Sequence, residues 1–408
     1  MTTSSVSIAV PLARPWQLSQ RASFALLASI VLFFLAGSAA PTPLYPVYQA
    51  AWGFSPVTVT FIFGIYAVAV LSTLLTFGSL SDYVGRRPVL IVATLVQAGT
   101  MIVFATADGL GALLVARVVQ GLSTGAAIAA IGAGLLDIDR SRGTVANSVA
   151  PMSGTAMGGI LSGLMVQYLP APTHLVYLVL AGIFVLQAAG VALMPESVVP
   201  RPGALASLRP RLRLPADLRS AVLLAAPALV ATWALAGFYG SLGPALVRRM
   251  LGSSSSVLGG LTLFVLAGSG ALTVVLLRRW PALRMMNAGA LALIIGVGIT
   301  LVAAAHGAAP SFFFGGALAG AGFGAGFQGA IRTVLPRTAA PDRAGVLSVL
   351  YLISYLAMGV PAVLGGLLVV HGGGLVATSR EYGAAVMALA ALALAGGLAR
   401  VRRAPARL

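Results

Sequence analysis

The side chains that could carry out covalent or acid–base chemistry are few in this sequence and do not cluster. Its 408 residues include no cysteine, three histidines and eight acidic residues. Without cysteine there is no thiol nucleophile, disulfide or Cys-ligated metal, and the scattered histidines lack metal-ligand spacing. What remains does not form a set of nucleophile, base and orienting residue, which argues against an enzyme. We expect neither a metal nor a cofactor.

One basic residue lies where a charge is costly. Arg117 is about seven residues, or roughly 10 Å, inside a long apolar stretch. An Arg at the centre of a membrane helix costs about 2.5–3.5 kcal/mol, so it should face a cavity rather than lipid. Gln120 and Thr124 follow at i+3 and i+7 and form one polar stripe with it. The stripe is a candidate for substrate binding or ion coupling; the alternative is an Arg that extends to the outer lipid headgroups.

A second polar group lies in a short segment between two apolar stretches and comprises Gly78, Asp82, Gly85, Arg86 and Arg87. Gly78 allows a neighbouring backbone to approach, and Gly85 permits a left-handed turn residue. Asp82 places one anion at the membrane surface, while the two arginines hold the turn in the cytosol. The pattern predicts a short charged loop between two membrane helices.

The elements that position these residues are predicted to be membrane helices. The sequence is 59% hydrophobic and 8% charged, with a mean hydropathy of +1.00, whereas soluble domains are roughly 25% charged. The net charge of +17 comes from arginines in the short gaps between apolar stretches rather than along one helix face. It therefore indicates membrane topology and lipid surroundings rather than a nucleic-acid partner.

Twelve segments have about the 20 apolar residues that a crossing needs. They lie near 22–40, 57–80, 88–107, 110–136, 145–168, 175–194, 221–247, 257–277, 285–305, 311–330, 344–370 and 382–398. We therefore expect an all-α polytopic membrane protein with twelve transmembrane helices in two pseudo-symmetric six-helix bundles. The expected parts are a cytosolic tail (1–21), the first bundle (22–194), a cytosolic linker (195–219), the second bundle (220–399) and a basic cytosolic tail (400–408).

Arginine placement predicts the orientation, because cytosolic loops carry the excess of positive charge. With the N-terminus inside, 21 of the 25 arginines are cytosolic, three are outside and Arg117 is within a span. Both termini are then cytosolic, as an even number of crossings requires. We expect a multi-pass protein of the cytoplasmic (inner) membrane.

Short internal matches support the two halves independently. Leu-Ala-Gly at 35–37 recurs at 235–237, Asp-Arg at 139–140 recurs at 342–343, and Met-Gly at 157–158 recurs at 358–359. The offsets are 200, 203 and 201 residues. A shared offset at equivalent span positions indicates two parallel six-helix repeats.

Residues 78–90 resemble the loop motif of the major facilitator superfamily, Gly-x-Leu-x-Asp-x-x-Gly-Arg-(Arg or Lys)-x-x-Leu, and fill every specified position. Tyr83 departs from the many members that have Arg directly after the Asp. Residues 113–121, Leu-x-x-x-Arg-x-x-Gln-Gly, resemble a second family motif that is associated there with proton coupling. The family resemblance extends to bacterial drug and solute exporters.

The fifth span contains a glycine stripe, Gly154, Gly158, Gly159 and Gly163. It resembles the family's antiporter motif, with Gly159 in place of Pro and Ser162 in place of Gly. The alternative is that these small residues serve close helix packing.

The resemblance implies that spans 1, 4, 7 and 10 line a central cavity and that Asp82 latches the outward-open form by meeting the N-terminal end of the eleventh helix near Ala344. The alternative for this loop is a purely topological anchor. Transferred to this sequence, the cavity candidates are Tyr45, Arg117, Gln120, Trp233, Tyr239, Phe323, Phe327 and Gln328, with Tyr351 and Tyr355 as similar candidates in the eleventh span. For each aromatic alone, packing or an interfacial belt is the alternative.

The expected function is secondary active transport of a small molecule by alternating access, as proton-coupled efflux of amphipathic compounds. All eight acids lie at or beyond predicted span ends, so coupling would use Asp82, Asp137 or a protonated substrate. One alternative is uptake or facilitated transport of a small polar or anionic solute attracted by Arg117, and another is a non-transporting membrane sensor. We expect a monomer.

Overall fold

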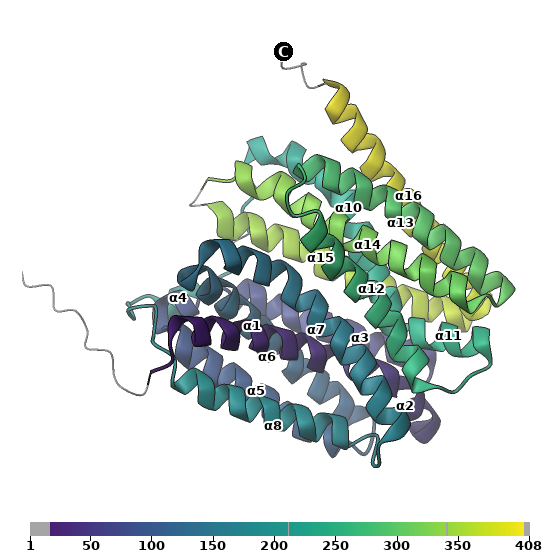
Figure 1. The fold of residues 1–408 in the computed structure, drawn as a ribbon, viewed down its shortest axis with the longest axis horizontal. Helices are drawn as coiled ribbons and strands as arrows, with labels where there is room; N and C mark the ends of the chain where they lie inside the picture. Colours follow the sequence, from purple (N-terminus) through teal and green to yellow (C-terminus); the bar gives the residue numbers. More distant parts are fainter. Residues whose placement is uncertain (1–16, 211, 340–341, 404–408) are drawn as a thin grey trace, which may run out of the picture.

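The computed structural model describes residues 17–210, 212–339 and 342–403 (Figure 1). These residues are 85% helical and contain no strand. The predicted all-α class is therefore confirmed. Most of the predicted N-terminal tail, Arg211 of the linker and the last five residues of the C-terminal tail lie outside the described residues.

The described residues form twelve long helices and several short helical elements. The long helices of the first half are α1 (Gln20–Ala39), α3 (Pro56–Phe77), α5 (Arg86–Ala105), α6 (Leu110–Ile138), α7 (Arg140–Tyr168) and α8 (Leu175–Ala192). Those of the second half are α10 (Arg219–Ser241), α12 (Ser256–Leu276), α13 (Ala282–His306), α14 (Ala309–Val334), α15 (Arg343–His371) and α16 (Gly374–Arg403). The short elements are η1 (Thr42–Leu44), α2 (Tyr45–Trp52), α4 (Ser81–Val84), α9 (Ala204–Ser207), η2 (Ala216–Leu218), α11 (Gly243–Leu251) and η3 (Leu335–Arg337).

Eleven helices of the described chain are long and apolar enough to cross a membrane. The remaining long helix, α14, occupies the place of the tenth predicted span. Seven of its 26 residues are glycine, which lowers its hydropathy without shortening it. The predicted boundaries differ most at two helices. The span expected at 221–247 ends at Ser241, and a separate helix, α11, begins at Gly243 with Pro244 at its start. The span expected to start at Tyr382 belongs to a helix that begins at Gly374.

The two halves repeat the same packing. In the first half α3 packs on α6, α5 on α8 and α1 on α7; in the second α12 packs on α14, α13 on α16 and α10 on α15. In each half, therefore, the second long helix contacts the fourth, the third contacts the sixth and the first contacts the fifth. Figure 1 shows the purple-to-teal half beside the green-to-yellow half, and they meet where α3 packs on α15 and α7 on α12.

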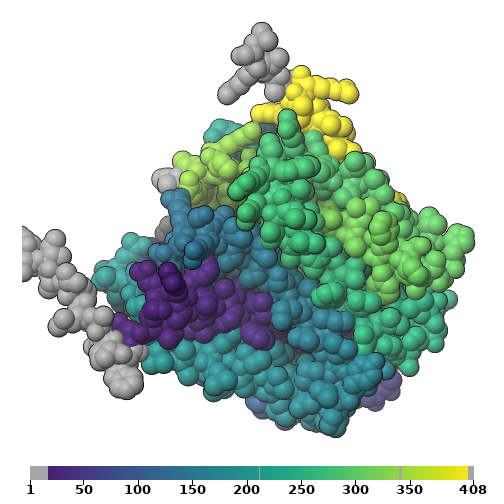
Figure 2. Space-filling view, in the orientation of Figure 1, coloured from purple at the N-terminus to yellow at the C-terminus, as the bar shows by residue number. Residues whose placement is uncertain are grey.

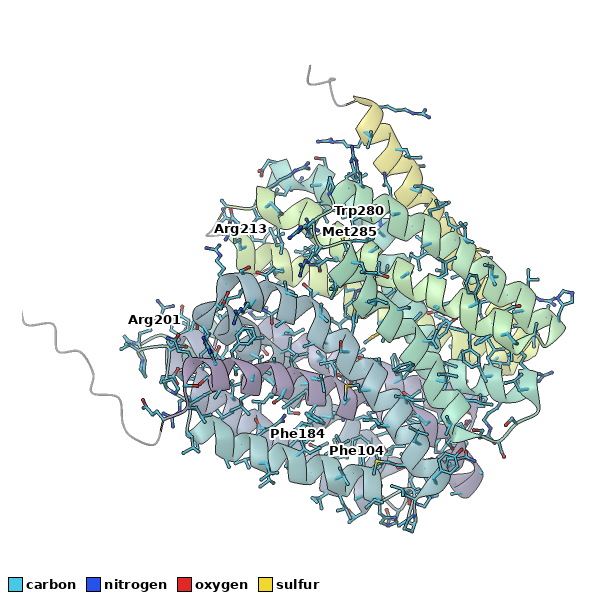
Figure 3. All side chains as sticks on the ribbon, in the orientation of Figure 1. Phe104, Phe184, Arg201, Arg213, Trp280 and Met285 are labelled. Atoms are coloured by element: carbon cyan, nitrogen blue, oxygen red, sulfur yellow. The ribbon has the colours of Figure 1, made fainter. Side chains whose placement is uncertain are left out.

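The ends of the molecule differ. One end, which we call the α4 end, carries α4 and the connecting segment 193–218; the opposite end, which we call the α11 end, carries α2 and α11 (Figure 1). Arg201, Arg213 and Trp280 all lie at the α4 end (Figure 3). The short helices α2 and α11 follow the first long helix of each half, so they too obey the repeat.

Glycines on two faces of α7 bring helix backbones into contact. A Cβ atom on Gly154 would lie 2.1 Å from Leu32 O of α1, and one on Gly158 would lie 2.2 Å from Ala36 O. On the other face, a Cβ on Gly159 would lie 2.9 Å from the Cβ of Leu263, and one on Gly163 would lie 2.7 Å from Ser256 O of α12. The stripe therefore packs α7 against its own half and against the other half at once.

The glycines of α14 act in the same way. A Cβ on Gly320 would lie 2.2 Å from Leu266 O of α12, and one on Gly329 would lie 2.5 Å from Met286 N of α13. Backbone contact on both sides explains why so glycine-rich a helix is retained in the interior. Lipid tails are as apolar as side chains, so close packing rather than a hydrophobic effect holds membrane helices together.

We predict that Gly158→Ala destabilises the protein by about 1–3 kcal/mol, because the added methyl group must displace α1. Thermal unfolding of the purified protein in detergent measures this loss. The matched control is Gly99→Ala in α5, where no atom lies within 4 Å of the new Cβ; there Ala should stabilise slightly through its higher helix propensity. Equal effects of the two changes would contradict the packing argument.

Candidate functional site

A cavity of about 180 Å³ lies between the two halves. The first half contributes residues of α1, α3 and α7, and the second half contributes residues of α10, α12, α14 and α15. Every lining residue within the described chain is uncharged. We call this space the central cavity.

Aromatic rings form the second half's side of the central cavity. The Trp233 ring meets Phe327 edge to face at 5.4 Å and Tyr355 at 4.9 Å between ring centroids. Phe323 and Phe327 are parallel, with centroids 6.4 Å apart. Three helices thus supply one aromatic wall, a surface suited to the face of an apolar or aromatic solute.

Helix α7 contributes uncharged polar groups to the first half's side of the cavity, beside apolar residues such as Phe63. Asn147, Pro151 and Thr155 are spaced four residues apart and so share one helix face. Ser148 also lines the cavity, and its Oγ accepts a hydrogen bond from Gln328 Nε2 of α14 at 3.0 Å. This bond joins the two halves beside the cavity.

A second cavity, of about 420 Å³, lies at the α4 end and shares Asn147 and Pro151 with the central cavity. Its lining includes Asp82, Arg209 and Tyr351. At the α11 end, hydrogen bonds join the halves instead: Thr42 Oγ1 donates to Gly240 O at 3.2 Å, and the Ser256 N–H donates to Gln167 Oε1 at 3.0 Å. The cavity system therefore extends toward the α4 end and is closed at the α11 end.

Arg117 is fully buried within the first half. Its Nη1 donates to Ser38 O at 2.9 Å and to Gln120 Oε1 at 2.7 Å, and its Nη2 donates to the Tyr45 hydroxyl. The guanidinium carbon lies 5.3 Å from the centroid of the Tyr66 ring. No carboxylate of the described residues pairs with it. Backbone carbonyl, side-chain amide and hydroxyl oxygens, together with aromatic faces, therefore stabilise this charge.

Arg117 and Gln120 bond to α1, and the polar stripe does not line the central cavity, so this part of the prediction was wrong. Arg117, Gln120 and Thr124 are all buried, yet none is among the residues that line the cavity. Gln120 Nε2 donates to Gly37 O of α1 at 3.1 Å. The reason is the close approach of α3, whose Tyr66 O would lie 2.7 Å from a Cβ on Gly121. Ser38 and Tyr66 stand between the stripe and the cavity, and the Arg does not reach the outer surface either.

The predicted aromatic and amide candidates differ in where the structure places them. Trp233, Phe323, Phe327 and Tyr355 line the central cavity, and Tyr351 lines the second one. Gln328 bonds to a lining residue. Tyr45 and Tyr239 do not line the central cavity: Tyr45 is buried against Arg117, and Tyr239 packs on Phe312 with ring centroids 6.4 Å apart.

Several lining residues were missed in the sequence, among them Phe63, Tyr66, Asn147, Met152 and Thr155. The signal that could have found the α7 group is the four-residue spacing of Asn, Pro and Thr at 147, 151 and 155. Phe63 and Tyr66 carry no such local signal, because only the packing of α3 on α15 turns them toward the cavity.

Arg86 holds the charged loop together. Its Nη1 donates to Ser81 Oγ at 2.6 Å and to the Asp82 carboxylate, and its Nε pairs with Asp137 Oδ2 at 3.2 Å. The Arg86 side chain is 9% exposed, while those of Asp82 and Asp137 are 42% and 36% exposed. One shielded cation is thus shared between two carboxylates that solvent can reach.

Glu196 joins this loop to the connecting segment, and sequence reasoning did not assign it a role. Its carboxylate accepts hydrogen bonds from the backbone N–H groups of Arg86 at 2.9 Å and Arg87 at 3.0 Å, which begin α5. An acid here satisfies free helix N–H groups and the helix dipole. Gly85 precedes them with φ of 102°, and a Cβ there would lie 2.6 Å from Glu196 Oε2. Its partner is 110 residues away, which no local pattern reveals.

Asp82 bonds to Arg86 and not to the eleventh span in this conformation. Asp82 and Ala344 both line the second cavity, which separates α4 from the start of α15. The predicted contact between Asp82 and the N-terminal end of α15 is therefore not formed here.

In the described part of the chain no group of three or more His, Asp or Glu side chains is placed to hold a metal.

Two repeats of six long helices that enclose a cavity between them define a helical membrane transporter. The sequence profile of the Major Facilitator Superfamily matches residues 26–304, and the chain belongs to this family. Membership of this family identifies a transporter rather than an enzyme.

Solved structures have the same fold at low sequence identity. A bacterial homologue of the human lysosomal transporter Spinster, in an inward-facing and unoccupied conformation, matches 97% of this chain and all of its own with a TM-score of 0.73 and 13% identity. A mutant of the nucleoside transporter NupG matches 93% of this chain and all of its own at 0.71 and 13%. The human organic anion transporter MFSD10 (TETRAN) matches 92% of this chain and all of its own at 0.63 and 18%.

We predict that Arg117→Lys destabilises the protein by about 1–3 kcal/mol, because an ammonium cannot reproduce the planar set of bonds to Ser38, Gln120 and Tyr45 and leaves buried acceptors unpaired. Thermal unfolding in detergent measures the change. The control is Arg249→Lys on α11, an exposed position that should keep wild-type stability. Wild-type stability of Arg117→Lys would overturn the assigned bonding.

Proposed function

We propose that this transporter exports small amphipathic compounds by alternating access, driven by the proton gradient. The observation that carries the proposal is the wall of the central cavity, which combines aromatic rings with a few uncharged polar groups and is free of charged side chains among the described residues. A solute with an apolar face and a few hydrogen-bonding groups fits such a wall.

The cavity lining argues against the alternative substrate, an anionic solute attracted by Arg117. An anionic solute in the central cavity would need a cation within reach. Arg209 lines the second cavity and not the central one, and Arg117 is the basic residue that lies behind the wall of the central cavity. Its guanidinium is sealed behind Ser38 and Tyr66 and bonded to three oxygens. Exposing it would sacrifice those bonds, so the uncharged wall supports the amphipathic solute. The organic anion transporter named above shares the fold at 18% identity.

The proposed movement is a rocking of the two halves about the cavity. To open at the α11 end, the protein must break the Thr42–Gly240 and Gln167–Ser256 bonds between the halves. To close at the α4 end, it must collapse the second cavity, which brings α4 toward the start of α15. Asp82 would then meet the N–H groups that begin α15 and act as a latch.

Proton coupling is proposed to act through Arg86 and its two acids. The central cavity offers no carboxylate among the described residues, so a proton must act elsewhere or enter on the substrate. Protonation of Asp82 or Asp137 removes one of the two charges that hold Arg86. The loop would then bind α5 and α15 differently, which links proton binding to the latch.

The orientation, boundaries and oligomeric state belong to the same proposal. Arg201 and Arg213 of the connecting segment lie at the α4 end (Figure 3), which under the positive-inside rule supports a cytosolic position of that end and of both termini. We retain bundles at 22–194 and 220–399 with a linker at 195–219, in the cytoplasmic membrane and as a monomer.

We predict that inverted membrane vesicles containing the protein accumulate an aromatic amphipathic dye when a proton gradient is imposed and lose it when an ionophore dissipates the gradient. Phe327→Ala should raise KM roughly 3- to 10-fold through the lost aromatic contact. The matched control is Phe314→Ala on the same helix, at a side chain that is 64% exposed. Gradient-independent equilibration, or equal KM values for both variants, would refute the proposed export.

We predict that Asp82→Asn lowers the turnover number roughly 3- to 30-fold while expression stays normal, because the neutral amide binds a helix N-terminus less strongly than a carboxylate. Initial rates at saturating substrate in the same vesicles measure turnover. Asp108→Asn, at an exposed loop position, serves as control and should transport at the wild-type rate. Unchanged transport by Asp82→Asn would rule out the latch.

A further inference from the structure

A groove of about 650 Å³ runs along the outside of the molecule at the α4 end, between α1 and α7 and beneath the end of α12. Figure 2 shows this face, on which α1 (purple), α7 (blue) and α12 (green) meet. The groove shares no lining residue with the central cavity or the second cavity. The transport mechanism above therefore leaves it unassigned.

One part of the groove is apolar and elongated. Phe24, Ala28 and Leu32 follow one another at four-residue spacing along a single face of α1, a strip roughly 12 Å long. Val145 and Val149 of α7 face the same space. These side chains lie within membrane-spanning helices, so the strip opens toward the hydrocarbon region and suits an acyl chain.

The other part of the groove is cationic. Arg142, from the first half, and Arg278, which follows α12 of the second half, both line it together with Ser141. The Nε of Arg142 lies 3.5 Å from the Asp139 carboxylate, which leaves its two Nη groups free for another acceptor, and its side chain is 74% exposed. No carboxylate of the described residues lies within ion-pair distance of Arg278. Two guanidinium groups and a hydroxyl thus line the same groove at the α4 end.

We propose that this groove binds one anionic phospholipid, with its phosphate between Arg142 and Arg278 and one acyl chain along α1 and α7. Guanidinium groups bind phosphate oxygens in pairs, and basic pockets at the cytosolic ends of membrane helices recognise anionic headgroups. The apolar strip selects a lipid over a soluble phosphate, since a free phosphate has no use for a hydrocarbon surface. Because one arginine belongs to each half, the bound headgroup bridges the two halves at the end where the cavity system extends outward.

The test is a lipid titration of the purified full-length protein in detergent, with thermal unfolding as the readout. Dioleoyl-phosphatidylglycerol should raise Tm by roughly 2 °C or more, whereas dioleoyl-phosphatidylcholine should not. Arg142→Gln and Arg278→Gln should each raise the half-saturating lipid concentration about fivefold, and the double variant about 25-fold. Arg249→Gln, at the α11 end, is the matched control and should titrate like the wild type.

A second variant tests the acyl-chain strip separately from the charges. Val145→Trp fills the groove at a position that is already 39% exposed, so the fold should tolerate it; it should weaken the lipid effect while both arginines remain. Equal titrations of the wild type and the double arginine variant would overturn the proposal, as would equal stabilisation by phosphatidylcholine. Full stabilisation by inorganic phosphate alone would also overturn it, because the site would then be one for a soluble anion.

Discussion

Along α7 and α14, backbone atoms rather than side chains meet the neighbouring helices. Within a membrane, helices gain little by hiding apolar side chains from lipid, so their association depends on how closely they can approach. Glycines at 154, 158, 159 and 163 allow α7 to touch α1 on one side and α12 on the other. The two halves are thereby held at a fixed spacing, and the large aromatic side chains that fit no such contact are left around the central cavity. The glycine contacts of α7 therefore help to determine where the cavity lies.

Arg117 and Arg86 are stabilised by different kinds of partner because their surroundings differ. Arg117 has no access to water, and its charge is balanced by carbonyl, amide and hydroxyl oxygens and by aromatic faces. Arg86, at the α4 end, is held between two carboxylates that solvent can reach. The first arrangement is rigid, because breaking any bond leaves an unpaired polar group in a medium that cannot satisfy it. The second can exchange partners at low cost, which makes it suitable for a switch.

The two ends of the molecule differ in how the halves contact each other. At the α11 end hydrogen bonds and glycine contacts join the halves, whereas at the α4 end the second cavity lies between them. Glu196 nonetheless ties the connecting segment to the start of α5, so the charged loop stays ordered on the open side.

Composition, hydrophobic length and arginine placement were enough to predict a polytopic all-α protein, because lipid imposes one secondary structure and one length on every crossing. The charged loop at 78–90 could likewise be predicted from the sequence, because its glycines and charges act on neighbouring residues of the same segment. The direction in which Arg117, Tyr45 and Tyr239 point could not be predicted. The sequence shows which residues share a helix face, but it does not show which neighbouring helix that face contacts. The role of Glu196 was hidden for the same reason: its partners lie 110 residues away along the chain. Only the packing of twelve helices decided which polar groups satisfy one another and which residues remain to line the cavity.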